Sequence, residues 1–476
     1  MMANTIVNNR LRYDNKSPRQ LIISIATLVC LFVVFSYFFF ADFSKYVIIS
    51  AFFVFLASVI VIARHEKTLL SPILLFLASF YLFQNGQLLL YSFNIIPNDF
   101  YINKSSEVIE NVCTFSSISA IVSSYAAILV VFNPKKRLSR KSRIDELDRD
   151  SICKFALLGF AITAIVALFL AFRKFTIALS GGYSSVRAYE ETISSVFNFI
   201  EYMFVPFSIL SLIYLKNKWL KALVFLVSGF FFLLTALSGD RTTGITGLIV
   251  LFLLYYLSVA RESKLKLKRL RIVVPFVVLL FFALMRVAYF VRSRIDFSIF
   301  AFFSLESIVD EVSEIGFSFY ALTTMMIVVP SKENFLYGKG YFLSMIGGVF
   351  PSFLDPTGTI QKINAESRVY SQWQSQYFNY DFGLGFSLNA ESYINFGWFG
   401  LLAIFLLCLF IFRMLSYSLK NNEKPNFSLY KSMVLLMLWF TLPRRDTYFV
   451  WKSIIYAIAF IYLYLLIFCK KIKRGH

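Results

Sequence analysis

Two short polar runs interrupt otherwise apolar sequence and carry side chains that could perform chemistry. The first, Ser238-Gly-Asp-Arg241-Thr-Thr-Gly244, opens a long apolar stretch. The free N–H groups and dipole of a helix N-terminus attract anions, and Arg241 with its neighbouring hydroxyls adds donors that suit a phosphate. The alternative is a Ser/Asp helix cap with a snorkelling arginine. Both interpretations stay open on this motif alone.

The second run surrounds Glu391 and opens a later apolar stretch. Ser387, Glu391 and Asn395 recur at four-residue spacing, so they share one face of an otherwise apolar helix. Asn389 and Tyr393 flank this polar stripe and could position a sugar or the carboxylate. A carboxylate in apolar surroundings is a candidate general base. The alternative is a structural carboxylate paired with an arginine.

Three further arginines lie close together at the end of another apolar stretch. Arg286, Arg292 and Arg294 fall within nine residues, with Tyr289 and Phe290 between them. A guanidinium group binds phosphate oxygens in a fixed fork, so this group could clamp a diphosphate. Anchoring in an aromatic belt at the membrane surface is the alternative.

Other arginines lie in two short connecting segments. Arg187 belongs to a Gly/Ser-rich loop that could gate a substrate or simply join two helices. Arg444 and Arg445 follow Pro443 and suggest an anionic partner, although Asp446 could neutralise one of them. Together the arginines and Glu391 predict a site that binds a phosphorylated substrate, with no metal among its expected components.

The elements that position these residues must span a membrane, because the composition excludes a water-soluble globule. Hydrophobic residues make up 58% of the 476 residues, charged residues only 16%, and the mean hydropathy is +0.69. Soluble domains average about 45–50% apolar and about 25% charged. Five scattered cysteines cannot form a disulfide framework, and two histidines exclude a His-rich metal centre.

Apolar stretches of the right length predict about twelve membrane crossings, since a bilayer core of about 30 Å needs about 20 apolar residues per helix. The chain is therefore expected to be an all-α, polytopic integral membrane protein, with the first stretch retained as a helix rather than removed as a signal peptide. The expected crossings are 20–40, 46–63, 69–93, 112–132, 152–172, 196–215, 219–237, 242–260, 272–291, 386–412, 428–443 and 450–469.

These crossings divide the chain into three expected regions. Residues 1–291 form an N-terminal transmembrane bundle of about nine spans, and 386–476 form a C-terminal bundle of about three. Residues 292–385 form a large outer loop, which is too long to be a simple connection. Its amphipathic stretch and two apolar patches, 315–330 and 341–354, could be re-entrant or interfacial helices, or a further pair of crossings.

The formal charge of +20 gives the orientation rather than a nucleic-acid footprint. Lys and Arg concentrate in alternate loops and at both ends of the chain, so the positive-inside rule predicts cytoplasmic termini. Arg241, Arg286 and Glu391 then lie at the outer face. In one cytoplasmic loop, Asp148 and Asp150 superficially match the paired acids that bind a metal in glycosyltransferases, but a solvated linker is the favoured interpretation.

Two motifs in this arrangement resemble those of the Wzy-type O-antigen polymerases, the oligosaccharide repeat unit polymerases. They are Ser-Gly-Asp-Arg241-Thr-Thr-Gly and Ala-Glu391-Ser-Tyr-Ile-Asn-Phe-Gly-Trp-Phe-Gly400. The expected spans and the large outer loop in the second half of the chain also fit this family. The resemblance implies a GT-C-like membrane glycosyltransferase architecture.

The resemblance also implies an activity, a location and partners. The protein would lie in the bacterial inner (cytoplasmic) membrane and polymerise oligosaccharide repeat units carried on undecaprenyl diphosphate, with its active site facing the periplasm. It would need no cofactor, no metal and no nucleic acid, and a chain-length regulator protein would be a further partner. Related ligases are thought to use an outer histidine. This sequence has none there, which suggests Glu391 in that role and Arg241 as its catalytic companion.

A lipid-linked oligosaccharide flippase, or another polysaccharide transporter, is the alternative class. It too would need cationic groups for a diphosphate and about a dozen spans. A transporter, however, is expected to carry charges along a central cavity, often on repeated halves. Here the charged residues within the spans gather at the outer ends and no repeat is visible, which favours the polymerase.

Overall fold

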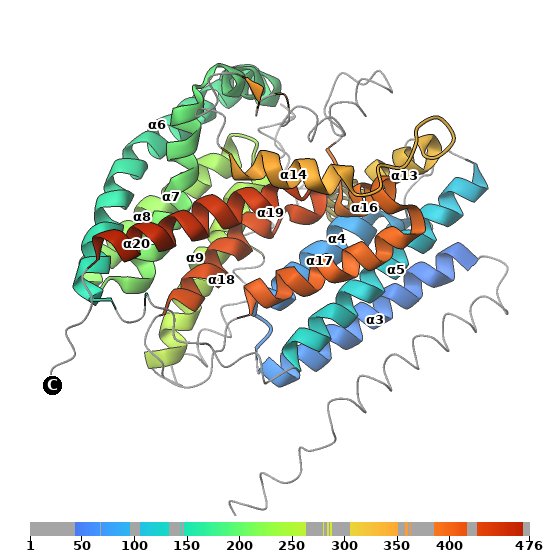
Figure 1. The fold of residues 1–476 in the computed structure, drawn as a ribbon, viewed down its shortest axis with the longest axis horizontal. Helices are drawn as coiled ribbons and strands as arrows, with labels where there is room; N and C mark the ends of the chain where they lie inside the picture. Colours follow the sequence, from blue (N-terminus) through green and yellow to red (C-terminus); the bar gives the residue numbers. More distant parts are fainter. Residues whose placement is uncertain are drawn as a thin grey trace, which may run out of the picture.

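The computed structural model describes most of the chain, and every structural statement below concerns these residues. They are 43–66, 68–95, 105–132, 144, 147–262, 279, 283–284, 286–287, 305–350, 358–359, 362, 385–416 and 426–469. Every element of regular secondary structure in them is a helix (Figure 1). The expectation of an all-α protein is therefore confirmed.

Nine helices of the described residues are long and apolar enough to cross a membrane, which confirms a polytopic membrane protein. The first seven are α3 (Phe43–Glu66), α4 (Pro72–Ser92), α5 (Ser106–Val131), α6 (Arg149–Thr192), α7 (Ser195–Tyr214), α8 (Lys218–Leu237) and α9 (Arg241–Glu262). The eighth joins α16 (Leu388–Phe396), η4 (Gly397–Phe399) and α17 (Gly400–Leu415), and the ninth joins α19 (Tyr448–Ser453), η6 (Ile454–Phe460) and α20 (Ile461–Phe468).

Three of the twelve expected crossings are not among these nine. The stretch 20–40 and nearly all of 272–291 lie outside the described residues. The stretch 428–443 contains α18 (Phe427–Trp439), a helix of 13 residues, and then the short turn η5 (Leu442–Arg444). Thirteen residues make a helix of about 20 Å, shorter than the hydrocarbon core. The count of twelve thus stays a prediction.

The two apolar patches expected in the loop 292–385 contain short helices. They are α13 (Phe319–Val328) with 10 residues and α14 (Lys339–Val349) with 11, preceded by α12 (Leu305–Gly316). Helices of that length reach only about 15–17 Å, about half of a bilayer core, so neither can cross alone. The helix α13 is largely buried and packs against α4, α5 and α16.

Eight of the helices form two packed groups, and α18 contacts both groups. One group contains α3, α4, α5 and α17, and the other contains α6, α7, α8 and α9 (Figure 1). The helix α18 packs against α4 and α17 on one side and against α7 and α9 on the other. The helices α13 and α14 lie above α16 and α19 in the view of Figure 1.

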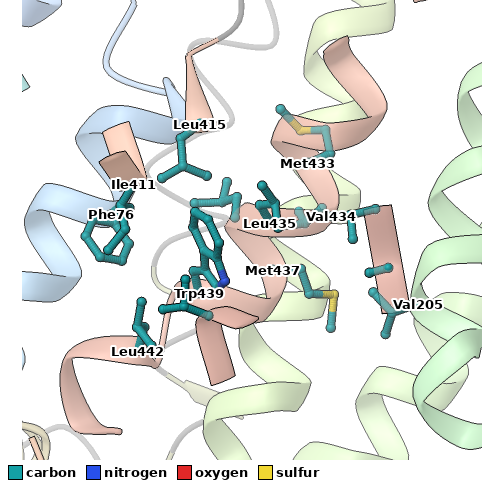
Figure 2. Packing of buried hydrophobic residues seen from close by; sticks show 14 of the residues in the cluster. Phe76, Val205, Ile411, Leu415, Met433, Val434, Leu435, Met437, Trp439 and Leu442 are labelled. Carbon is teal, nitrogen blue, oxygen red and sulfur yellow. The ribbon is translucent and has the colours of Figure 1, made fainter. Parts of the chain in front are cut away.

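The buried side chain of Trp439 marks the joint between the two groups. Figure 2 shows it among Phe76 of α4, Ile411 of α17 and Leu442 of η5, all of which are buried. Its indole N–H donates to Ser453 Oγ at 2.6 Å, so the polar atom of the ring is satisfied inside the core. The turn η5 packs against α4, α16 and α18.

A glycine break separates α16 from α17. Gly397 has φ +56°, a conformation that residues with a Cβ rarely adopt, and a Cβ on Gly400 would lie 2.5 Å from the carbonyl oxygen of Ser392. The expected single apolar helix therefore begins as a separate helix of nine residues, with Ser387 as its N-cap. As a result, Glu391 lies in the first turn of a short buried helix.

Candidate functional site

Arg241 lies at the beginning of α9, held by a tight hairpin with α8. The Asp240 side chain accepts a hydrogen bond from the backbone N–H of Thr243 at 3.2 Å, so the expected cap is present. A Cβ on Gly244 would lie 2.5 Å from the carbonyl oxygen of Phe232, and only glycine permits this close approach of α8. The Arg241 side chain is buried rather than extended along the surface, unlike a snorkelling arginine.

Arg241 and Arg286 converge on one carboxylate. Each places Nη1 at 3.6 Å from Oε1 of Glu311, and Arg241 also pairs with Glu314. Glu311 and both arginines are buried, whereas the side chain of Glu314 is 33% exposed. The structure thus gathers two of the expected arginines from separate parts of the sequence, beside a carboxylate that reaches solvent.

Burial is the main influence on Glu311 and raises its pKa above the ordinary value, while Arg241 and Arg286 act in the opposite direction. A guanidinium pair facing a buried carboxylate is an anion-binding arrangement, since the acid supplies the oxygen ligands that the arginines require. The sequence alone does not distinguish Glu311 or Glu314 as site residues. Their spacing of three residues on one amphipathic helix was the available signal.

Among the described residues, the structure adds none of the other expected arginines of this region to the pair formed by Arg241 and Arg286. Arg187 lies on the part of α6 beyond a kink at Gly182, where it pairs with Glu190 at 3.0 Å and stacks over the Tyr183 ring. It interacts electrostatically with Asp240, so it lies near the beginning of α9, but its side chain is 63% exposed. Arg292 and Arg294 lie outside the described residues.

Glu391 is buried in a network of hydroxyl and backbone donors. Thr447 donates to its carboxylate from the backbone N–H at 2.9 Å and from Oγ1 at 2.7 Å, and Ser344 Oγ donates at 3.4 Å. The residue is 1% exposed. These donors tie α16 to α14 and to the beginning of α19. Among the described residues the partners of Glu391 are hydroxyls and a backbone amide, whereas the alternative interpretation had paired it with an arginine.

The residues that flank Glu391 anchor α16 to its neighbours. Asn389 Nδ2 donates to Ser119 Oγ of α5 at 2.9 Å, and the Tyr393 hydroxyl donates to the carbonyl of Val329 at 3.5 Å. Asn395 accepts from the backbone N–H of Gly340 at 3.0 Å. These contacts hold the helix that presents Glu391 in a fixed orientation.

The last expected arginines, Arg444 and Arg445, lie at the end of the turn η5. Arg445 lies over the Phe449 ring at 4.5 Å, and Arg444 Nε lies 3.8 Å from where a Cβ on Gly385 would be. Asp446 is buried and interacts electrostatically with Glu391. This turn therefore places Arg444 near the residues that precede α16, and Asp446 supplies a second carboxylate near Glu391.

Three buried carboxamides of α4 lie between the helix α12 and the turn η5, and the sequence alone does not distinguish them as site residues. Gln84 donates to the carbonyl of Pro443 in η5, and Gln87 donates to Ser313 Oγ of α12 at 3.0 Å. With Asn85 between them, all are 0% exposed. The available signal was a Gln-Asn-Gly-Gln run inside an apolar stretch, where buried polar groups carry a large cost.

The paired acids Asp148 and Asp150 have structural roles. Asp148 caps α6 by accepting from Ser151 N–H at 2.9 Å, and Asp150 forms an exposed ion pair with Lys216 at 2.7 Å. Within the described ranges, no group of three or more His, Cys, Asp or Glu side chains could hold a metal ion. A helix cap and a surface pair agree with the favoured interpretation of a linker.

The fold and these buried charges define a polytopic membrane protein with arginine and carboxylate groups gathered where several spans begin or end. A family model described as O-antigen polysaccharide polymerase Wzy matches residues 22–475, nearly the whole chain. The chain therefore belongs to the Wzy family of O-antigen polysaccharide polymerases, and the resemblance is confirmed. No curated protein and no solved structure matches it significantly. Membership supports O-antigen polymerisation as the general function, acting on lipid-linked oligosaccharide repeat units.

Proposed function

We propose that this protein polymerises undecaprenyl-diphosphate-linked repeat units at the periplasmic face of the bacterial inner membrane, with arginines stabilising the diphosphate leaving group. The convergence of Arg241 and Arg286 on Glu311 carries this proposal. A lipid diphosphate offers the same kind of oxygen ligands as Glu311 and Glu314, and more negative charge. It would enter beside the partly exposed Glu314 and bind the two guanidinium groups.

The reaction proposed at this site is a glycosyl transfer. A hydroxyl of the acceptor sugar attacks the anomeric carbon of the donor, the bond from that carbon to the diphosphate oxygen breaks, and the diphosphate keeps the electron pair. Arg241 and Arg286 stabilise the negative charge that develops on this oxygen, in a setting where water is largely excluded. Glu391 takes the proton of the attacking hydroxyl.

The other expected residues have supporting roles in this proposal. Arg187, Arg444 and Arg445 bind the anionic part of the substrates, as Arg292 and Arg294 do on sequence grounds, while Asn389 and Tyr393 hold α16 in place. Because Glu391 is covered by Thr447 and Ser344, the hydroxyl groups of these two side chains must rotate away from the carboxylate to admit the sugar hydroxyl. Independence from metals and contact with a chain-length regulator remain part of the proposal.

Purified protein tests this function directly. Reconstituted with lipid-linked repeat units alone, it is expected to produce a ladder of products that differ by one repeat. A flippase would instead move units between leaflets without joining them. Movement between leaflets in the absence of a ladder would contradict the proposal and support the transporter alternative.

Thiol labelling tests the proposed orientation. Glu191 and Lys216 are both exposed. Glu191 precedes α7 and Lys216 follows it, so the two residues lie at opposite ends of this helix. In a cysteine-free background, a membrane-impermeant maleimide added to spheroplasts is expected to label Glu191→Cys and to leave Lys216→Cys unlabelled until the membrane is broken. The reverse pattern would place the arginine cluster in the cytoplasm.

A further inference from the structure

The carboxamides of α4 form a buried polar segment inside a membrane-spanning helix. Gln84, Asn85 and Gln87 occupy three of four consecutive positions, and all are fully buried. Polar groups in such surroundings are costly unless they bind partners, and residues of this kind in membrane helices usually serve a function. The proposed reaction gives these three side chains no role, so their contacts call for an explanation.

Gln84 connects α4 to the segment 443–447, which contacts Glu391. Its amide N–H donates to the carbonyl oxygen of Pro443, which directly precedes Arg444. Three residues later, Thr447 donates two hydrogen bonds to the carboxylate of Glu391. A single hydrogen bond from α4 thus fixes the segment that holds the proposed base.

Gln87 connects the same helix to the segment that holds the arginines. Its amide N–H donates to Ser313 Oγ on α12 at 3.0 Å, and Ser313 lies between the two acids that pair with Arg241. Close packing supports this contact, since a Cβ on Gly86 would lie 3.3 Å from the carbonyl oxygen of Val312 and 3.5 Å from the Cα of Gly316.

Gln84 and Gln87 make these two contacts from the same side of α4. Residues three apart are neighbours on a helix surface and are separated by about 4.5 Å along its axis. We infer that Gln84 and Gln87 are positioning residues, which hold the Glu391 turn and the Arg241–Arg286 cluster at a fixed separation around one substrate. This inference rests on the proposed function, in which the two groups act on the same donor and acceptor.

A positioning role predicts a particular kinetic effect. The arginines and Glu391 remain in variants of the two glutamines, so binding of the lipid diphosphate is retained. What is lost is their alignment, and misplacement by about 1 Å can reduce a rate about 100-fold. We expect Gln84→Leu and Gln87→Leu to lower kcat by about 10- to 100-fold while KM changes by no more than about threefold.

Asn85→Leu is the matched control. Asn85 is a carboxamide of the same helix and equally buried, but its side-chain atoms make no hydrogen bond within the described part of the chain. Its variant is expected to stay within about threefold of the wild-type kcat. An equal loss in Asn85→Leu would show that any buried carboxamide matters here and would overturn the inference.

Ser313→Ala removes the acceptor of Gln87 from the other side, without altering the buried helix. If Gln87 acts through Ser313, this variant lowers kcat as Gln87→Leu does, and the double variant is no slower than either single one. Additive losses, or full activity in Ser313→Ala, would contradict the inference. Arg241→Ala, measured in parallel, distinguishes failure of the proposed function from failure of the positioning role. Full activity of Arg241→Ala overturns the proposed function. Fully active glutamine variants together with an inactive Arg241→Ala overturn only the positioning role.

Discussion

Replacing Arg241 with alanine is expected to abolish long O-antigen chains and leave single repeat units on the lipid A core. The side chain is buried between Glu311 and Glu314 at the beginning of α9, where the helix dipole adds to its positive charge. Removing one donor that stabilises charge in a transition state costs about 100- to 1,000-fold in rate. Electrophoresis of lipopolysaccharide from cells that express the variant measures the chain length.

Arg241→Lys refines this prediction. Lysine keeps the charge but cannot contact two oxygens in a fixed fork, so we expect short chains rather than none. Lys216→Ala is the control, since its pair with Asp150 is exposed at the other end of the helices and such pairs contribute little. Normal chains in Arg241→Ala, at wild-type protein levels in the membrane, would exclude a role in the reaction.

Replacing Glu391 is expected to have the second large effect. Glu391→Gln keeps a side chain that can accept from Thr447 and Ser344, but it cannot take a proton at neutral pH. General bases contribute about 100- to 10,000-fold, so the glutamine variant should be inactive although it is folded. Ladder formation by purified protein measures the activity, and the amount of monodisperse protein after detergent extraction measures folding.

Thr447→Ala separates the chemical role of Glu391 from a structural one. This variant removes one hydroxyl donor and keeps the carboxylate and the backbone donor of residue 447. A base role predicts that it retains more activity than Glu391→Gln. If Glu391→Gln and Glu391→Ala both form full-length polymer, the carboxylate is not the base.

The spanning helices were predicted well from the sequence, because each depends only on the hydrophobicity of its own residues. Apolar stretches of about 20 residues define spanning helices whatever surrounds them, and nine were found among the described residues. The division of the Glu391 helix at Gly397 was harder to foresee, because a glycine in an apolar run also permits close packing without a break. The short length of α13 and α14 likewise depended on packing against other helices.

Contacts between distant segments could not be predicted from the sequence. The motif at Arg241 indicated an anion site, but its pairing with Glu311 depends on how α12 packs over α4. Glu391 was expected to pair with an arginine if it was structural, and it binds Thr447 and Ser344 instead. A single sequence does not show which polar residues meet, so the contacts of Gln84 and Gln87 could not be predicted from it.

Binding of undecaprenyl diphosphate to purified protein tests most directly whether the arginine cluster holds the lipid carrier. The measurement compares wild type, Arg286→Ala and Lys216→Ala in detergent, with undecaprenol as the ligand that lacks phosphate. We predict that Arg286→Ala binds the diphosphate at least about tenfold more weakly, since a charge-assisted pair is lost, and that undecaprenol binds all three proteins alike. Equal affinity of wild type and Arg286→Ala for the diphosphate would contradict the account.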